Sequence, residues 1–223
     1  MLFLAVFCGF LAEYQLEHKI EKDKEKVFIK SMIEDLETDT LNISNHLVFR
    51  SDRQRRLDSL SFLLQLSDFN NHTGLIYYYA RWGARNPSFF LTDRTISQLK
   101  YSGGMRLITK HAASTAIMAY DAQIKFLGNQ SFALEQDAVK EHFHLMTSIF
   151  AGYILDEIYG DSTLVIPNGN PPLLSNDRKI LEQFLSHLHF VKSLNKRNLF
   201  FETKLKQQAS ETIEILKKEY PLK

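Results

Sequence analysis

The sequence contains few of the residues that interrupt or cross-link a chain. Its 223 residues include one cysteine, five prolines and nine glycines. Because Cys8 is the only cysteine, an intrachain disulfide and a zinc site built on cysteines are both excluded. The scarcity of proline and glycine leaves long uninterrupted stretches, which favour helices. A chain of this length forms either one domain of fair size or two small ones.

The chain also lacks an excess of one charge and the short motifs of common catalytic sites. Its formal net charge is +1, with acids and bases finely mixed. A nucleic-acid-binding surface normally shows a large basic excess, so we expect no nucleic-acid partner. There is no Gly-x-Ser-x-Gly nucleophile motif, no Walker loop and no Gly-x-Gly-x-x-Gly fingerprint. We therefore expect no cofactor, and a protein that is not an enzyme.

An apolar run, Met1–Ala12 (MLFLAVFCGFLA), opens the sequence and leads into a highly charged segment. As an α-helix this run covers only about 18 Å, whereas a bilayer core is about 30 Å thick. Four interpretations compete: a cleaved signal peptide, a lipoprotein modified at Cys8, a buried core helix, and a membrane anchor whose first residues are missing. No basic residue precedes Leu2 and a bulky Phe7 precedes Cys8, so we favour the truncated anchor.

One very long helix, or two helices in line, is expected from Leu16 to about Phe69, because this segment has no glycine or proline. Its apolar residues recur at helical spacing and define one stripe. The stripe comprises Ile29, Met32, Leu36, Ile43 and Leu47. Four arginines follow it and form a basic cluster that we expect to be solvated. They are Arg50, Arg53, Arg55 and Arg56.

The rest of the chain predicts further helices separated by turns. A short helix is expected from residues 92–93 to 100, and longer ones over 105–127, 131–160 and 175–220. Gly128-Asn129 is expected to end the helix over 105–127. The fold class predicted is all-α: an antiparallel bundle of about four long helices, the first continuous with an N-terminal membrane segment. We expect the anchor at 1–16 and the bundle at 17–223, with an aromatic loop at 70–91 and a Pro/Gly loop at 160–175.

The eight histidines invite a metal site, but their spacing does not favour one. His142 and His144 are two residues apart, as are His187 and His189, and such pairs point about 200° apart on a helix. Glu141 and His144 form a Glu-x-x-His, which dimetal bundles need on two helices. No second copy is present, so we predict no metal ligand.

The aromatic loop is the strongest candidate for a ligand site. Aromatic rings beside arginines can line a pocket, and function concentrates on loops held by a rigid scaffold. The competing interpretation is that these aromatics fill one end of the bundle. The candidate ligand- or partner-binding residues are Tyr77, Trp82, Arg85 and Phe89.

Two stretches resemble a family of uncharacterised, membrane-anchored helical proteins of Bacteroidota-type bacteria, whose shared domain has no known function. The first is Phe3–Asp39, with an apolar anchor, a short polar junction and a charged helix. The second is Leu91–Asp121, with a signature formed by Thr95, Leu99, Ser102, Gly103, Leu107, Ile108, Ile117 and Tyr120. The resemblance implies no catalytic residue. Family members have a longer N-terminal span with basic residues before it, and both are lacking here.

These observations predict a single-pass membrane protein that contacts lipid through its N-terminus. We expect it in the bacterial inner membrane, and the resemblance favours a bundle on the periplasmic side. The expected function is a non-enzymatic scaffold or sensor-like interaction module, with a protein partner or a second copy of itself. The alternative is a binding module for a small apolar or aromatic ligand that uses the Tyr77–Phe90 loop.

Overall fold

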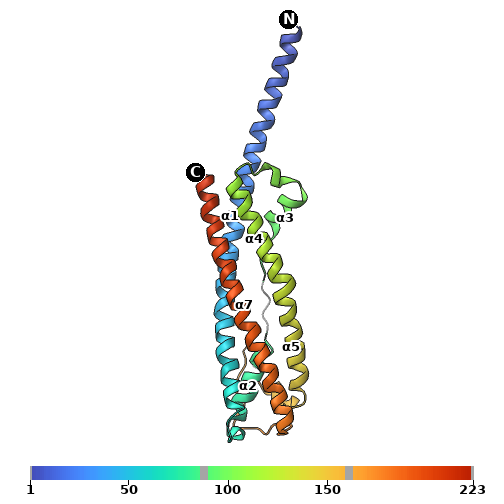
Figure 1. Ribbon diagram of the computed structural model, residues 1–223, viewed down its shortest axis with the longest axis vertical. Helices are drawn as coiled ribbons and strands as arrows, with labels where there is room; N and C mark the ends of the chain where they lie inside the picture. Colours follow the sequence, from blue (N-terminus) through green and yellow to red (C-terminus); the bar gives the residue numbers. More distant parts are fainter. Residues whose placement is uncertain (1, 86–89, 159–162, 222–223) are drawn as a thin grey trace. The chain divides into compact units, whose positions relative to one another are not determined.

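The computed structural model describes residues 2–85, 90–158 and 163–221, and these residues form helices without a β-strand (Figure 1). The predicted all-α class is confirmed. The α-helices are α1 (Leu2–Leu63), α2 (Thr73–Gly83), α3 (Arg94–Tyr101), α4 (His111–Phe126), α5 (Ala133–Met146), α6 (Gly152–Glu157) and α7 (Arg178–Glu219). Two short 3₁₀ turns, η1 (Phe69–His72) and η2 (Gly104–Leu107), and a π-helical segment, η3 (Leu127–Phe132), connect some of them.

The helices α1 and α7 are long because nothing in their sequences ends them. They contain 62 and 42 residues and no proline. The predicted helix end at Gly128-Asn129 is wrong, since the chain passes from α4 to α5 through the π-helical segment η3. A glycine permits the left-handed conformation of a helix cap but does not impose it. Here Gly128 has no positive φ.

The chain divides into two compact units. Unit 1 comprises Met1–Ser44, Phe90–Ile124 and Lys204–Lys223, and unit 2 comprises Asn45–Phe89 and Lys125–Thr203. The helices α1, α4 and α7 contribute residues to both units. The predicted boundary between residues 16 and 17 lies inside α1, which continues unbroken through it.

The core of unit 1 lies between α1, α3, α4 and the last part of α7. Four members of the predicted stripe of α1 are buried in it: Ile29, Met32, Leu36 and Ile43. Two buried aspartates of α1 hold the segment that leads into α3. Asp35 accepts hydrogen bonds from Arg94 Nε at 2.5 Å and from the Thr95 backbone N–H at 3.1 Å. Asp39 accepts from the Thr92 N–H at 2.7 Å and from the Tyr120 hydroxyl at 2.6 Å.

The core of unit 2 is larger and more apolar. Its residues come from the end of α1, from α2, from the segment that contains α5 and α6, and from the start of α7. They include Leu57, Leu60, Ile76, Tyr77, Ala80, Met146, Ile149, Phe150, Phe184, Leu188 and Val191. The part of the predicted Pro/Gly loop that the structure describes, residues 163–175, contains no helix.

The predicted membrane anchor is not supported. In residues 2–85, 90–158 and 163–221, no helix has an apolar stretch long enough to cross a bilayer. The apolar run ends at Ala12, and Glu13, Glu17 and Lys19 follow within the next two turns of α1. A spanning helix needs about 20 predominantly apolar residues. The predicted location in the bacterial inner membrane, with the bundle on the periplasmic side, is therefore wrong, and the predicted transmembrane helix is not confirmed.

Candidate functional site

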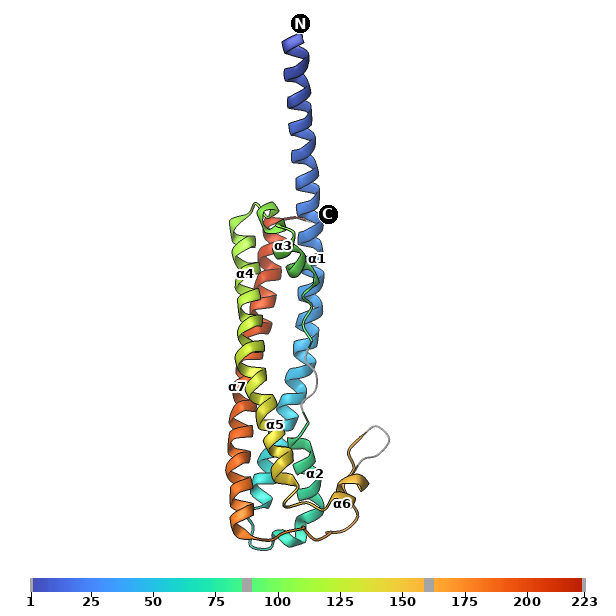
Figure 2. The ribbon, with the colours of Figure 1, turned by 90° about the vertical axis from the view of Figure 1, so that its right-hand side faces the viewer.

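The first part of α1 extends beyond the other helices of unit 1. Both views show it projecting past α3, α4 and the C-terminal end of α7 (Figures 1 and 2). Every side chain described from Phe3 to Lys24 is exposed, and Glu25 is the first buried one. At about 1.5 Å per residue, this exposed segment is roughly 33 Å long.

One side of the exposed segment carries an aromatic stripe, which consists of Phe3, Phe7, Phe10 and Tyr14. Their exposed fractions are 82%, 51%, 68% and 68%. The rings of Phe3 and Phe7 stack, with centroids 6.4 Å apart. The intervals of four, three and four residues place all four side chains on the same side of the helix. An exposed row of large apolar groups of this kind is unusual unless it has a partner.

The core of unit 2 contains a second candidate, a layer of buried charges that we call the ion cluster. It consists of His46, Arg50, Arg53, Glu135, Asn195, Asn198 and Glu202, all of them buried. They come from α1, α5 and α7, and the three helices thus contribute to one polar layer. Buried ionised side chains are rare in proteins unless they are paired, so each contact in this layer matters.

Two arginines and two glutamates form the centre of the ion cluster. Arg50 donates to both oxygens of Glu135, at 2.9 and 2.8 Å, and its Nε donates to Glu202 at 2.5 Å. Arg53 donates to Glu135 as well, and to the carbonyl oxygen of Gly83 at 2.8 Å. The two negative and two positive charges balance, so the layer carries no net charge from these four groups.

Polar side chains complete the ion cluster. His46 Nδ1 lies 2.8 Å from the second oxygen of Glu202. Asn198 donates to Glu135 at 2.7 Å, and Asn195 donates to the Arg50 carbonyl oxygen at 3.0 Å. Such hydrogen bonds compensate for the water that a buried ion loses.

The ion cluster favours the ionised form of Glu135. Burial alone would raise the pKa of this carboxyl group, but the hydrogen bond and charge of Arg50, followed by those of Arg53, outweigh it. Together they lower the pKa of Glu135 to about 2. Burial lowers the pKa of Arg53. The carboxylate of Glu135 is engaged by two guanidinium groups, so it is a poor general base, and the cluster is suited to holding helices together rather than to proton transfer.

The sequence prediction that all four arginines are solvated is wrong for Arg50 and Arg53. A signal for their burial is present, because they continue the row of inward positions of α1 at alternating intervals of three and four. This row runs through Ile43, His46, Arg50, Arg53, Leu57 and Leu60. The same spacing on α7 runs through Leu188, Val191, Asn195, Asn198 and Glu202. Polar residues inside an otherwise apolar row mark a buried polar layer.

His142 lies next to this layer and is completely buried. Its Nε2 is 2.9 Å from the carbonyl oxygen of Ala80. A carbonyl oxygen can only accept, so Nε2 carries the proton of the neutral imidazole. Burial, together with the nearby His187 and Arg53, lowers the pKa of His142 to about 4, against the opposing hydrogen bond to Ala80. The ring of His187 is 5.7 Å away, centroid to centroid.

Of the predicted ligand-binding residues, the structure brings Trp82 and Arg85 into contact and buries Tyr77 in the core of unit 2. Tyr77 is buried: its hydroxyl donates to the Pro172 carbonyl oxygen and accepts from the Ala151 N–H, each at 3.0 Å, and its ring packs edge-on against Phe150. The ring of Trp82 contacts two guanidinium groups: the Cζ atoms of Arg56 and Arg85 lie 4.1 and 4.7 Å from its centroid.

Phe89 lies outside the residues that the structure describes. Tyr77, Trp82 and Arg85 line neither the pocket of about 640 Å³ at the end of unit 2 nor the groove of about 340 Å³ on α1. A ligand site on the Tyr77–Phe90 loop stays a prediction.

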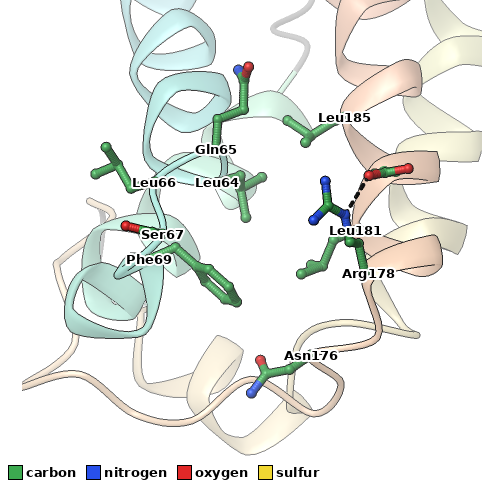
Figure 3. Close-up of a pocket in the computed structure, with 10 residues that line it drawn as sticks. Leu64, Gln65, Leu66, Ser67, Phe69, Asn176, Arg178, Leu181 and Leu185 are labelled. Carbon is green, nitrogen blue, oxygen red and sulfur yellow. Dashed lines mark hydrogen bonds and ion pairs between the residues drawn. The ribbon is translucent and has the colours of Figure 1, made fainter.

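The larger pocket lies at the end of unit 2, between the turn that follows α1 and the start of α7 (Figure 3). We call it the end pocket; its volume is about 640 Å³. One wall is formed by Leu64, Gln65, Leu66, Ser67 and Phe69, and the other by Asn176, Arg178, Leu181, Glu182 and Leu185. The sequence does not indicate this site, because its two walls are more than a hundred residues apart in the chain. A smaller, open groove of about 340 Å³ on α1 is lined by Ile20, Asp23, Lys24, Val27 and Phe28.

Within the described ranges, no group of three or more His, Cys, Asp or Glu side chains is arranged to hold a metal ion. No protein-family model, curated protein or solved structure matches the chain. The resemblance carried by Phe3–Asp39 and Leu91–Asp121 therefore stays a prediction.

Proposed function

We propose that the chain is a non-enzymatic scaffold or sensor-like interaction module that associates with a second copy of itself through the aromatic stripe of α1. The observation that carries this proposal is the exposure of every side chain described from Phe3 to Lys24. Isolated helices of this length are marginal in water, and most helical stability comes from packing of an apolar face. A helix that covers the stripe would supply that packing.

The position of the stripe favours a helical partner. The intervals of Phe3, Phe7, Phe10 and Tyr14 repeat 22 residues later in Glu25, Ile29, Met32 and Leu36, all of which are buried in unit 1. Twenty-two residues correspond to about 6.1 helical turns, so the stripe lies within about 40° of the buried side of α1. The exposed side therefore continues a side of α1 that already packs against helices.

Area and charge favour a second copy as this partner. Four aromatic side chains of this size bury roughly 600–1,000 Å². A stable interface buries about 800 Å² per partner, and the stripe, with its side chains 51–82% exposed, supplies roughly half or more of that area. The segment from Glu13 to Lys24 contains four acids and three lysines. A near balance of charges does not repel a second copy, and it offers acids and bases for pairing beside the stripe.

We also propose that the helices form the arrangement expected from the sequence, an antiparallel bundle of about four long helices. In such a bundle the ion cluster of unit 2 would specify one register of α1, α5 and α7, as buried polar groups do in some coiled coils. The support is that the charges of the cluster pair with one another.

The test is the mass of the full chain in solution, measured by light scattering after size-exclusion chromatography. We expect the wild-type chain, of 25.9 kDa, to approach twice that mass as its concentration rises. The double substitution Phe7→Glu and Phe10→Glu places charges in the stripe, and we expect it to stay monomeric at every concentration. Circular dichroism would establish that this variant keeps its helices.

Leu16→Glu is the matched control. Leu16 is also exposed, at 59%, but lies about 200° around the helix from Tyr14. We expect this variant to associate as the wild type does. A wild-type chain that is monomeric at all concentrations would overturn the proposal, and so would equal effects of the stripe and control substitutions.

A further inference from the structure

We propose that the end pocket binds a monocarboxylate with an apolar chain, such as a medium-chain fatty acid. The site is independent of the aromatic stripe, because it lies in unit 2 and shares no residue with it. Its volume of about 640 Å³ falls within the range of small-molecule sites, about 300–1,000 Å³.

The inner surface of the end pocket is apolar. Leu64 and Leu181, at 5% and 6% exposure, belong to the core of unit 2 and close the pocket from within. Leu66, Phe69 and Leu185 are partly buried against the same core. Figure 3 shows the ring of Phe69 directed into the space between the two walls. An apolar chain placed there would remove both its own surface and these side chains from water.

Hydrogen-bond donors lie at the rim. Arg178 points toward the same space in Figure 3, and its Nε donates to Glu182 at 2.8 Å. This bond orients the guanidinium group and leaves its two terminal nitrogens without a partner in the described part of the chain. Asn176, also on the rim, adds an amide donor.

This arrangement selects a carboxylate over other head groups. A guanidinium edge binds a carboxylate through two parallel hydrogen bonds, which are stronger than bonds between neutral groups. A neutral alcohol offers one acceptor oxygen without a charge to the two terminal nitrogens of Arg178, and an ammonium group offers no acceptor at all. Glu182 is already paired with Arg178, so it offers less to a cationic head group.

The experiment is a titration of the full chain with octanoate, octanol and octylammonium, followed by calorimetry and by amide chemical shifts. We expect octanoate to bind most tightly of the three. The shifted amides should map to residues 64–69 and 176–185. Leu185→Gln, which introduces a polar group into the pocket wall, should weaken both octanoate and octanol.

Arg178→Gln isolates the head-group contact. Arg178 is exposed, so its replacement leaves the core intact. We expect this variant to bind octanoate at least about tenfold more weakly, and to bind octanol unchanged. Lys179→Gln removes a neighbouring exposed charge that does not line the pocket, and should leave octanoate affinity unchanged.

Three results would overturn the proposal. The first is equal affinity for octanoate and octanol together with no effect of Arg178→Gln, which would indicate an apolar cavity without head-group selection. The second is a preference for octylammonium, which would assign the head-group contact to Glu182. The third is the absence of shifts at residues 64–69 and 176–185.

Discussion

Arg50 and Glu135 face each other in the core of unit 2 as a bidentate pair, with both terminal nitrogens of the guanidinium group bonded to both oxygens of the carboxylate. They are 85 residues apart in the chain, and their side chains are 1% and 2% exposed. In this geometry the loss of one partner leaves a charge in the core without compensation.

Glu135→Gln is expected to destabilise the protein strongly, because Arg50 and Arg53 would stay buried with one carboxylate fewer. Breaking a buried pair in this way costs about 3–5 kcal/mol. Urea unfolding followed by circular dichroism measures the change. Asp137→Asn is the control on the same helix: its exposed pair with Lys140 contributes at most about 1 kcal/mol. Similar losses for the two variants would contradict this account of the ion cluster.

Protonation of the Glu135 carboxylate is expected to destabilise the folded protein in acid. The pKa of Glu135 falls from its ordinary value of 4.5 to about 2 in the folded chain. A group whose pKa is lower in the folded state stabilises it above the unfolded pKa, and this contribution disappears as the pH falls from about 4.5 toward 2. The slope of unfolding free energy against pH should be smaller in Glu135→Gln over this window. An unchanged slope would assign the acid sensitivity to other carboxyl groups.

The burial of His142 predicts a loss of stability over a second, separate pH range. Its pKa is lowered from 6.5 to about 4, first by burial and then by the neighbouring charges. The neutral imidazole therefore stabilises the fold above pH 6.5, and this contribution is lost as the pH falls from about 6.5 toward 4. His142→Gln keeps an amide donor for the Ala80 carbonyl oxygen but cannot titrate, so its stability should vary less over this window.

His144→Gln is the control for this prediction, because His144 is exposed on the same helix. Urea unfolding at a series of pH values distinguishes the two variants. The account fails if His142→Gln retains the wild-type loss of stability between pH 6.5 and 4.

Gly74→Ala tests a close approach between α2 and the described part of the Pro/Gly loop. A β-carbon at this position would lie 2.4 Å from the carbonyl oxygen of Gly169, which belongs to the backbone and cannot turn away. Gly74 also donates its N–H to the Asn170 side chain at 3.3 Å. We expect a loss of about 1–3 kcal/mol in unfolding free energy, as in other overpacked sites.

Gly152→Ala is the matched substitution in an open position. No atom lies within 4 Å of a β-carbon added there, and Gly152 has no positive φ. We expect it to be neutral, or stabilising by up to about 1 kcal/mol because alanine favours the helix. Thermal unfolding of both variants measures the contrast, and a neutral Gly74→Ala would disprove the close approach.

Much of the local structure follows from the sequence because it depends on neighbours along the chain. The spacing of Ile29, Met32, Leu36 and Ile43 predicts the helix and its buried side, and all four are buried. The helix end predicted at Gly128 is wrong, because a glycine permits a helix end without imposing one and the chain continues there through the π-helical segment η3.

The predicted site residues show where local patterns stop being informative. Tyr77 is buried and bonded to Pro172 and Ala151, which are 95 and 74 residues away. Nothing near Tyr77 in the sequence indicates these partners. The end pocket was missed for the same reason, since residues 64–69 and 176–185 form one site only after the chain has folded.

The sequence by itself determined the all-α class, the buried side of α1 and the approximate extent of α7, because these depend on composition and on spacing within one helix. The tertiary structure decided which polar residues are buried: Arg50 and Arg53 look like surface arginines until Glu135 and Glu202 reach them from other helices. A buried charge is tolerated only beside its partner, and that partner is chosen by which helix sides meet in space.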